Sequence, residues 1–217
     1  MVKEEIKIDG KKRTIITNDW LREFPSYKKY KPCIWKKLVG PLALSMGYGV
    51  SYGTDYKIMV AVFNLANPLD FMCANLATEP RSRRFMISWP QHEKGLYKEA
   101  VEELSELAPI SLEGPITLSQ VIEGYKNYTG FKEERHFEDP ALICAWAGQL
   151  EKAKECLDWG LEAFKSSNRP NPYGSFEKWY EMMLEKISNP EALRQVVKDQ
   201  IHLHKLEKLP YQELIID

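Results

Sequence analysis

The sequence lacks the long hydrophobic run that a membrane-spanning helix requires. None of its apolar stretches approaches the roughly 18 consecutive residues that cross a bilayer as a helix. The first residues, MVKEEIKIDGKKR, are charged and contain no apolar core of a secretion signal. We therefore expect a soluble cytoplasmic protein that makes no contact with membranes.

Cysteine is scarce, and its spacing fits neither a metal site nor a disulfide framework. The four cysteines are Cys33, Cys73, Cys144 and Cys156, and no two of them form a C-x-x-C pair. Free, buried thiols in a reducing compartment are therefore the expectation. No zinc site and no other metal site is predicted.

The motifs of common enzyme classes are also missing. The chain has no G-x-S-x-G nucleophile motif, no lysine in a phosphate-binding loop and no aspartate-rich loop. His202 and His204 would point to different faces of one helix, so they do not meet on one metal ion. The glycines between Gly47 and Gly53 resemble a dinucleotide fingerprint only faintly, because a strand rather than a helix follows them. We therefore expect no cofactor and favour a non-catalytic protein.

Neither sign of charge is in excess. Lysine and arginine number 30 and the acidic residues 31, so the net charge of −1 supplies no field that favours nucleic acid. The chain is 44% hydrophobic and 28% charged, which is an ordinary globular composition. Its 217 residues suffice for one large domain or two small ones.

The N-terminal half carries the alternating apolar pattern of strands. Asp9–Gly10 stands between two pairs of isoleucines and predicts the tight turn of an N-terminal hairpin. The main signal covers residues 42–65, interrupted by residues 47–56, whose glycines and tyrosines suit a long hairpin connection. The part after this connection is apolar on both faces, which predicts a central strand covered on both sides.

The C-terminal half has helical periodicity instead. Residues 96–107, 118–128 and 137–165 carry apolar stripes of helical spacing, and so do two further segments after Ser175 and Asn189. Thr117, Ser175 and Asn189 can each cap the helix that follows. We therefore predict an α+β fold, in which an antiparallel β-rich half packs on a half of about five helices. No clean linker separates the halves, which favours a single domain over residues 1–217, β-rich to about residue 90 and helical over about 91–209.

A helical pair within residues 137–165 is the most strongly patterned part of the chain. Asp139 can cap a helix and Pro140 suits its first position. Gly148 can adopt the left-handed conformation that ends that helix. Trp146 and Leu157 lie on apolar stripes, so we expect them to be core contacts between the two helices.

This pair resembles the helical hairpin of tetratricopeptide repeats. The resemblance implies close helix packing and a surface that binds another protein. Gly160 departs from the pattern, because a second alanine is usual there, and no fixed short period recurs, so a regular solenoid is not expected. The residues that match the pattern are Ala141, Gly148, Leu150, Ala153 and Leu157.

Tyrosine and arginine mark a candidate binding surface. Both side chains often dominate the energy of protein interfaces, and tyrosines with glycines form many recognition loops. Arginine clusters also suit carboxylate or phosphate partners. We therefore predict that the glycine-rich connection and a nearby basic segment, EPRSRRF, contact a partner. The residues of this prediction are Tyr48, Tyr52, Tyr56, Arg81, Arg83 and Arg84.

An acidic flank is a second candidate surface. It lies on or near one side of the helix predicted for residues 96–107. Such a flank is usually a solvated face, but it also suits a basic partner. Its members are Glu99, Glu102, Glu103 and Glu106.

The stretch WKKLVGPLALSMGYGVSYGTDYKIMVAVFNLANP resembles small bacterial proteins of unknown function, some of which are linked to toxin–immunity loci. The resemblance implies an immunity protein, which neutralises a toxin by direct binding and needs a complementary surface rather than a catalytic group. A different class stays open from the residues alone. This alternative is a small enzyme or ligand-binding protein whose pocket lies where the sheet meets the helices.

Overall fold

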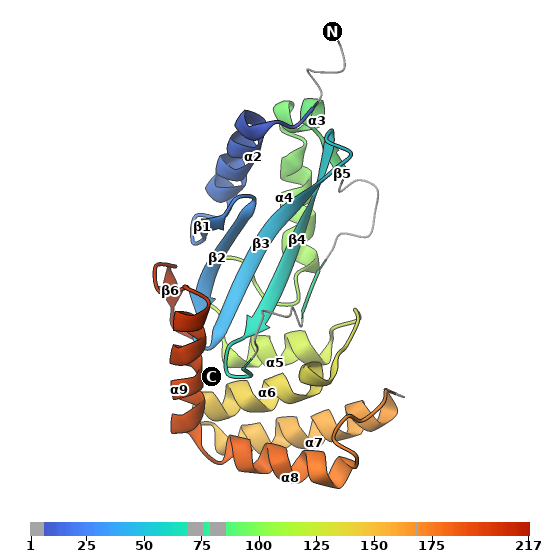
Figure 1. Ribbon diagram of the computed structural model, residues 1–217, viewed down its shortest axis with the longest axis vertical. Coiled ribbons are helices and arrows are strands. Elements are labelled where there is room, and N and C mark those ends of the chain that lie inside the picture. The colour runs from blue at the N-terminus through green and yellow to red at the C-terminus, as the bar shows by residue number, and fades with distance from the viewer. Residues whose placement is uncertain (1–6, 69–75, 79–85, 168) are drawn as a thin grey trace.

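The computed structural model describes residues 7–68, 76–78, 86–167 and 169–217. A twisted antiparallel sheet occupies the N-terminal half, and helices make up most of the C-terminal half (Figure 1). This arrangement confirms the predicted α+β class. The described part of the C-terminal half holds seven helices, α3 to α9, rather than about five.

The sheet is built mainly from neighbouring hairpins. Its strand order is β1-β2-β3-β4-β5, and β6 adds to β2 in the parallel direction. Strands β3 and β4 pair along their full lengths. The strands are β1 Lys28–Lys31, β2 Ile34–Val39, β3 Leu42–Ser51, β4 Asp55–Asn64, β5 Met86–Ser88 and β6 Tyr211–Gln212.

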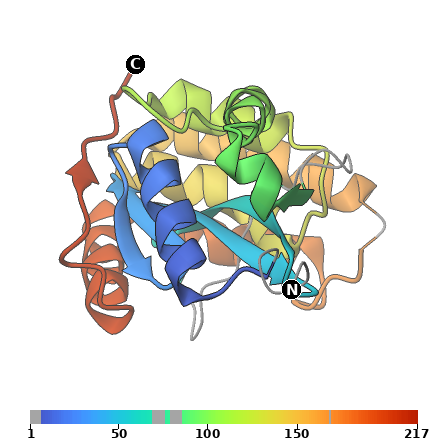
Figure 2. The same ribbon diagram turned by 90° about the horizontal axis from the view of Figure 1, so that it is seen from above.

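Helix α2 (Gly10–Glu23) lies on one face of the sheet (Figure 2). Tyr48 and Tyr56, on β3 and β4, are buried on this face and contact α2 by hydrogen bonds. Consecutive residues of β2 and of the first half of β3 are buried, so both faces of the sheet are covered there. Strand β4 alternates between buried and less buried residues, and Met59 on its other face is 42% exposed. The prediction of a strand covered on both sides is therefore wrong at this position.

The N-terminal hairpin prediction is wrong as well, because the segment forms α2. Asp9 caps this helix by accepting a hydrogen bond from the Lys12 amide at 2.9 Å. Asp followed by Gly can open a turn or cap a helix, and here the capping role prevails. The choice is decided by burial, because Ile16 and Trp20 lie four residues apart and are both fully buried.

The connection between β3 and β4 is short rather than long. The strands continue through most of the segment predicted to be a loop, and residues 52–54 alone turn the chain. Tyr52 and Gly53 both have positive φ angles, +50° and +75°. Gly53 adopts this conformation without steric cost, whereas Tyr52 is a rarer occupant of it.

The helix caps predicted at Thr117, Ser175 and Asn189 are confirmed. Thr117, Ser175 and Asn189 each accept a hydrogen bond from the backbone amide three residues later. None of the helices that the structure describes is long and apolar enough to cross a membrane. The C-terminal helices are α3 Trp89–Glu93, α4 Tyr97–Leu107, α5 Leu118–Lys126, α6 Glu134–Trp146, α7 Leu150–Ser166, α8 Phe176–Ile187 and α9 Pro190–Leu203.

Helix α6 begins five residues before the predicted cap. Asp139 and Pro140 lie inside it, where proline removes one helical hydrogen bond. The Asp139 side chain is fully buried and accepts hydrogen bonds from other elements instead of capping its own helix. Tertiary partners of this side chain therefore override the local capping signal.

The predicted turn between α6 and α7 is confirmed at Gly148, whose φ is +79°. Leu157 is fully buried, as expected. Trp146 is half-buried, packs against the core and lies against Gly40, at the β2–β3 turn. Gly160 is required by close packing, because a Cβ there would stand 2.3 Å from the carbonyl oxygen of Phe137.

Candidate partner-binding site

The predicted tyrosine loop is not one surface. Tyr48 and Tyr56 are 5% and 0% exposed and face the core, so their predicted contact with a partner is wrong. Tyr52 projects fully from the turn, so a partner contact through this residue stays open as an alternative. The predicted arginines, Arg81, Arg83 and Arg84, lie outside the described residues.

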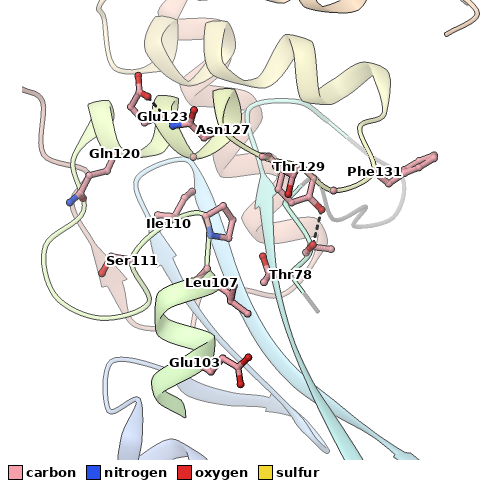
Figure 3. A pocket seen from close by; sticks show the side chains of 16 residues that line it. Thr78, Glu103, Leu107, Ile110, Ser111, Gln120, Glu123, Asn127, Thr129 and Phe131 are labelled. Carbon is pink, nitrogen blue, oxygen red and sulfur yellow. Dashed lines mark hydrogen bonds between the residues drawn. The ribbon is translucent and has the colours of Figure 1, made fainter. Parts of the chain in front are cut away.

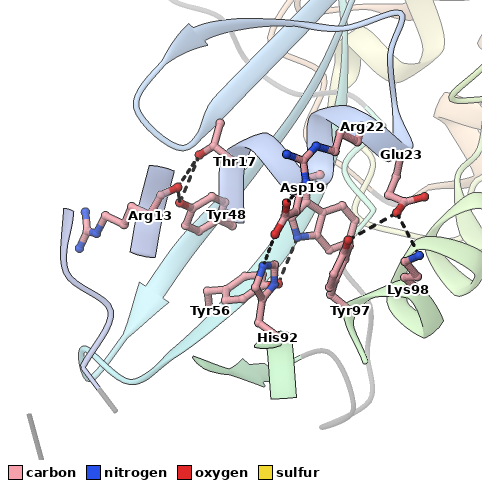
Figure 4. Close-up of polar contacts among 11 residues, drawn as sticks. Arg13, Thr17, Asp19, Arg22, Glu23, Tyr48, Tyr56, His92, Tyr97 and Lys98 are labelled. Atoms are coloured by element: carbon pink, nitrogen blue, oxygen red, sulfur yellow. Dashed lines mark hydrogen bonds and ion pairs between the residues drawn. The ribbon is translucent and has the colours of Figure 1, made fainter. Parts of the chain in front are cut away.

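The two buried tyrosines belong to polar contacts that hold α2 on the sheet (Figure 4). The Tyr48 hydroxyl donates to the carbonyl oxygen of Arg13 at 2.8 Å and lies 3.3 Å from the Thr17 hydroxyl. The Tyr56 hydroxyl accepts a hydrogen bond from the Trp20 indole at 3.1 Å. Their hydroxyls therefore bind helix to sheet and are unavailable to a partner.

A chain of hydrogen bonds continues from Tyr56 to His92 and Asp19 (Figure 4). The Asp19 carboxylate can only accept, so neutral His92 carries its proton on Nε2, and the Tyr56 hydroxyl donates to Nδ1 at 2.8 Å. The His92 Nε2–H then donates to the Asp19 carboxylate at 3.1 Å. Burial lowers the pKa of His92, and the Asp19 carboxylate opposes this effect.

The Tyr56–His92–Asp19 hydrogen bonds are arranged as in an acid–base relay, but a substrate cannot reach them. His92 is 3% exposed and Tyr56 is fully buried, and both ring nitrogens of His92 are already hydrogen-bonded. A general base must reach the proton of a substrate. We therefore assign these hydrogen bonds a structural role, in which they join α2, β4 and α3.

A second buried polar cluster joins the sheet to the C-terminal helices. One oxygen of Asp139 accepts hydrogen bonds from the amides of Asn64 and Asn67, at 3.0 and 3.1 Å. The other oxygen accepts from the Tyr125 hydroxyl at 2.9 Å. Burial raises the pKa of Asp139 to about 6, although these hydrogen bonds favour the charged form.

The adjacent carboxylate, Glu138, is also buried and also serves the fold. It accepts hydrogen bonds from the Trp179 indole at 3.0 Å and from the Tyr173 hydroxyl at 2.8 Å. A third donor is the Asn67 amide at 3.0 Å. The two carboxylates therefore act as acceptors that fix the end of β4 against α5, α6 and α8.

His136 lies near this cluster in an aromatic enclosure. Its ring is fully buried, and four aromatic rings have centroids 5.4 to 6.2 Å from its own. Burial lowers the pKa of His136 to about 4. The residues around it are Tyr125, Tyr128, Phe137 and Trp159.

The buried histidine predicts a specific acid sensitivity. The pKa of His136 is about 6.5 in the unfolded chain and about 4 in the folded chain. The free energy of unfolding therefore decreases as the pH falls from about 6.5 to about 4, because the unfolded chain takes up the proton first. The full loss is about 3 kcal/mol. Asp139 acts oppositely, because its raised pKa makes the folded state more stable as the pH falls from about 6.

Replacing His136 with phenylalanine isolates the first effect. We expect the stability difference between variant and parent to grow in favour of the variant by about 3 kcal/mol between pH 7 and pH 4. Urea unfolding at both pH values measures it, with the exposed His202→Phe as control. An unchanged difference across this range would show that folding does not change the pKa of His136.

A groove lies between α4 and α5, with a volume of 1030 Å³ (Figure 3). The end of α4 and residues 108–111 form one wall, and α5 forms the other. Residues 128–131 and the short segment 77–78 close the end nearest the sheet. The groove thus lies at the junction of sheet and helices, which is where the alternative hypothesis from the sequence placed a pocket.

Close backbone contacts shape this groove. A Cβ at Gly124 would stand 2.4 Å from the carbonyl oxygen of Pro109, so glycine lets α5 approach the opposite wall. The Tyr128 hydroxyl donates to the carbonyl oxygen of Ala77 at 2.7 Å. Thr78 exchanges two backbone hydrogen bonds with Val60 of β4, at 2.9 and 3.1 Å. These contacts attach the floor and one end of the groove to the sheet.

The surface of the groove combines apolar and acidic side chains. Leu107 is 50% exposed and Phe131 is 70% exposed. Glu103 and Glu123 also line it, whereas none of its described lining residues is a lysine or an arginine. Just outside, the Arg169 guanidinium lies over the Phe131 ring at 4.1 Å. The groove therefore offers apolar contact area within an acidic surrounding.

Sequence reasoning found only part of this site. Glu103 was in the predicted acidic flank, but Leu107, Glu123 and Phe131 were not predicted to bind a partner. The signal that could have found Phe131 is a large aromatic residue in a short polar connection between two helices. Within the described ranges, no group of three or more His, Cys, Asp or Glu side chains could hold a metal ion.

Comparisons with known proteins identify no relative of this chain. No protein-family model, no curated protein and no solved structure matches the chain at a significant level. The geometry and chemistry of the groove are therefore the basis on which a function is proposed.

Proposed function

We propose that this protein is a non-catalytic protein-binding module whose partner occupies the groove between α4 and α5. One observation carries the proposal. Leu107 and Phe131 are large exposed apolar side chains that line the same groove as Glu103 and Glu123. Exposed apolar groups bind by losing water, and carboxylates in a lining whose described residues include no lysine or arginine select a positively charged partner. The occupant is therefore a basic segment that carries at least one large apolar side chain.

The specific form that we propose is neutralisation of a toxin, as in the immunity proteins that residues 35–68 resemble. Such a protein needs a stable fold and a complementary surface, and the buried Asp139 and His92 clusters supply stability rather than chemistry. Proteins that act on nucleic acids carry basic surfaces. An acidic groove suits a toxin of that kind, because covering its basic surface would block access to its substrate.

The second candidate is a ligand-binding protein or small enzyme that uses the same groove. The observation in its favour is the volume of 1030 Å³, which is at the upper end of the range of about 300 to 1,000 Å³ for ligand pockets. Exposed Phe131 argues against it, since a small ligand is usually enclosed by its site. An exposed aromatic side chain is better suited to contact a protein segment than to enclose a small ligand.

Photocrosslinking at two positions tests the proposal. The photoreactive residue benzoylphenylalanine replaces Phe131 in one variant and Tyr52 in a matched control, because both side chains are exposed and lie on different connections. We expect position 131 to crosslink a basic protein in a lysate of the source cells, and position 52 not to. Added 0.5 M salt or the substitution Glu103→Lys should suppress the crosslink, since both weaken charge attraction.

Three other outcomes would overturn the proposal. A crosslink at position 52 alone would return the partner to the predicted tyrosine turn. A crosslink at 131 that resists both salt and Glu103→Lys would show that the acidic side chains do not select the partner. No protein crosslink at either position, together with a co-purified small molecule, would favour the ligand-binding alternative.

A further inference from the structure

A strongly basic strand forms one edge of the sheet. Strand β1 has the sequence KKYK, and Lys28, Lys29 and Lys31 are all exposed. It pairs with β2 on one side, and no strand that the structure describes pairs with its outer side. An open edge of this kind can accept a further extended chain through backbone hydrogen bonds.

The end of α9 brings more lysines to this edge. The Tyr30 hydroxyl of β1 donates to the carbonyl oxygen of His204 at 2.8 Å. The Lys28 ammonium donates to the carbonyl oxygen of Lys208 at 3.2 Å. These contacts place the exposed Lys205 and Lys208 in the turn beside β1. We call the five exposed lysines, Lys28, Lys29, Lys31, Lys205 and Lys208, the basic edge.

Lys205 occupies a position that favours glycine. Its φ is +55°, in the left-handed region that ends a helix. The surrounding hydrogen bonds, from Lys205 to His202 and from Leu206 to Ile201, have the pattern of a glycine-type helix end. A left-handed lysine costs the fold about 1 kcal/mol relative to glycine. A lysine is therefore present at a position where glycine would make the fold more stable.

Opposing charges near the basic edge are few. Glu207 lies in the same turn and is hydrogen-bonded to His202 at 2.9 Å. Glu213 follows β6, whose strand continues the same edge of β2. A third carboxylate, Glu113, accepts from the backbone amide of Ser26 at 3.1 Å, just before β1. Among the residues that the structure describes, these three carboxylates face five lysines, which leaves the edge positive. Its lysines also repel the same edge of a second copy, which disfavours pairing between copies.

We propose that the basic edge binds an acidic, extended polypeptide segment that adds to the sheet alongside β1. The open backbone of β1 can hydrogen-bond to such a segment, and the lysines attract its carboxylates. Nucleic acid would supply the negative charge but not the strand backbone. This surface lies at the β1 edge of the sheet, whereas the groove is attached through Thr78 to β4. The two surfaces can therefore be tested independently.

A synthetic peptide of alternating glutamate and threonine, eight residues long with blocked ends, is the probe. We expect salt-dependent binding to the full chain and backbone amide NMR shifts concentrated in residues 28–31. A matched peptide with proline in place of each threonine keeps the charge but loses backbone donors. It should bind at least about tenfold more weakly, because it cannot form the strand ladder.

The substitution Lys205→Gly separates binding from stability. It should raise the melting temperature, because glycine suits the left-handed position, yet weaken peptide binding about two- to fivefold through the lost charge. A merely structural role of Lys205 would not move the two quantities in opposite directions. The exposed Lys186→Gln on α8 is the control and should leave both unchanged.

Two results would overturn this inference. If a twelve-residue single-stranded oligothymidine binds more tightly than the peptide and shifts the same amides, the edge recognises phosphate rather than an added strand. If the peptide shifts no amide in residues 28–31, the lysines serve only to keep the edge from pairing with other chains.

Discussion

Replacing Asp139 with alanine is expected to lower the free energy of unfolding by about 3 to 5 kcal/mol. The carboxylate accepts hydrogen bonds from Asn64, Asn67 and Tyr125, all of which are buried at the junction of sheet and helices. A buried donor that loses its acceptor costs about 1 to 3 kcal/mol. Asn67 keeps its bond to Glu138, so two donors carry most of the loss.

Chemical unfolding at pH 7 measures this loss, and Asp139→Asn is the matched control. Asparagine keeps the volume and one acceptor oxygen, so it should cost about half as much or less. It also removes the charge whose burial raises the pKa of Asp139. If alanine is tolerated with a loss below about 1 kcal/mol, the cluster does not hold the sheet to the helices.

Replacing Leu157 with alanine is expected to cost about 2 to 5 kcal/mol. Leu157 is fully buried on α7, in the hairpin that α6 and α7 form. Removing a buried leucine side chain loses its burial and leaves a cavity. The close approach of the helices at Gly160 limits how far they can collapse into that space. The loss should therefore lie in the upper part of the range.

Leu150→Ala is the control for this substitution, because Leu150 begins the same helix and is 47% exposed. It should cost less than about 1 kcal/mol. Equal losses for the two variants, or a loss below about 0.5 kcal/mol for Leu157→Ala, would contradict the assignment of Leu157 to the core.

The helix ends that were predicted correctly depend on local chemistry. Thr117, Ser175 and Asn189 cap helices through hydrogen bonds to amides only three residues away. Gly148 ends α6 because its left-handed conformation is cheap for glycine alone. Such features are contained within a few residues, so a single sequence predicts them.

The errors arose where one dipeptide can serve two purposes. Asp9–Gly10 can open a hairpin or a helix, and burial of Trp20 against the sheet decides between them. Asp139–Pro140 can begin a helix, but the groups that donate hydrogen bonds to the Asp139 carboxylate come from other elements of the fold. Local propensity cannot identify such partners, because their proximity is a product of the fold.

The groove was unpredictable for a similar reason. Its walls come from segments as far apart as Thr78, Leu107 and Phe131, and no pattern in the sequence links them. The tyrosine prediction is wrong for Tyr48 and Tyr56 because alternation along a strand sends both side chains to the buried face. Of the predicted acidic flank, Glu103 lines the groove.

Dissociation constants for the partner captured at position 131 test the central claim most directly. They are measured for the parent, for the double variant Glu103→Lys/Glu123→Lys and for Tyr52→Ala, after melting curves confirm that all three fold. The groove account predicts that the double variant binds more than about tenfold more weakly, or about 1.4 kcal/mol, while Tyr52→Ala binds like the parent. Tenfold weaker binding by Tyr52→Ala, with the double variant unchanged, would contradict it.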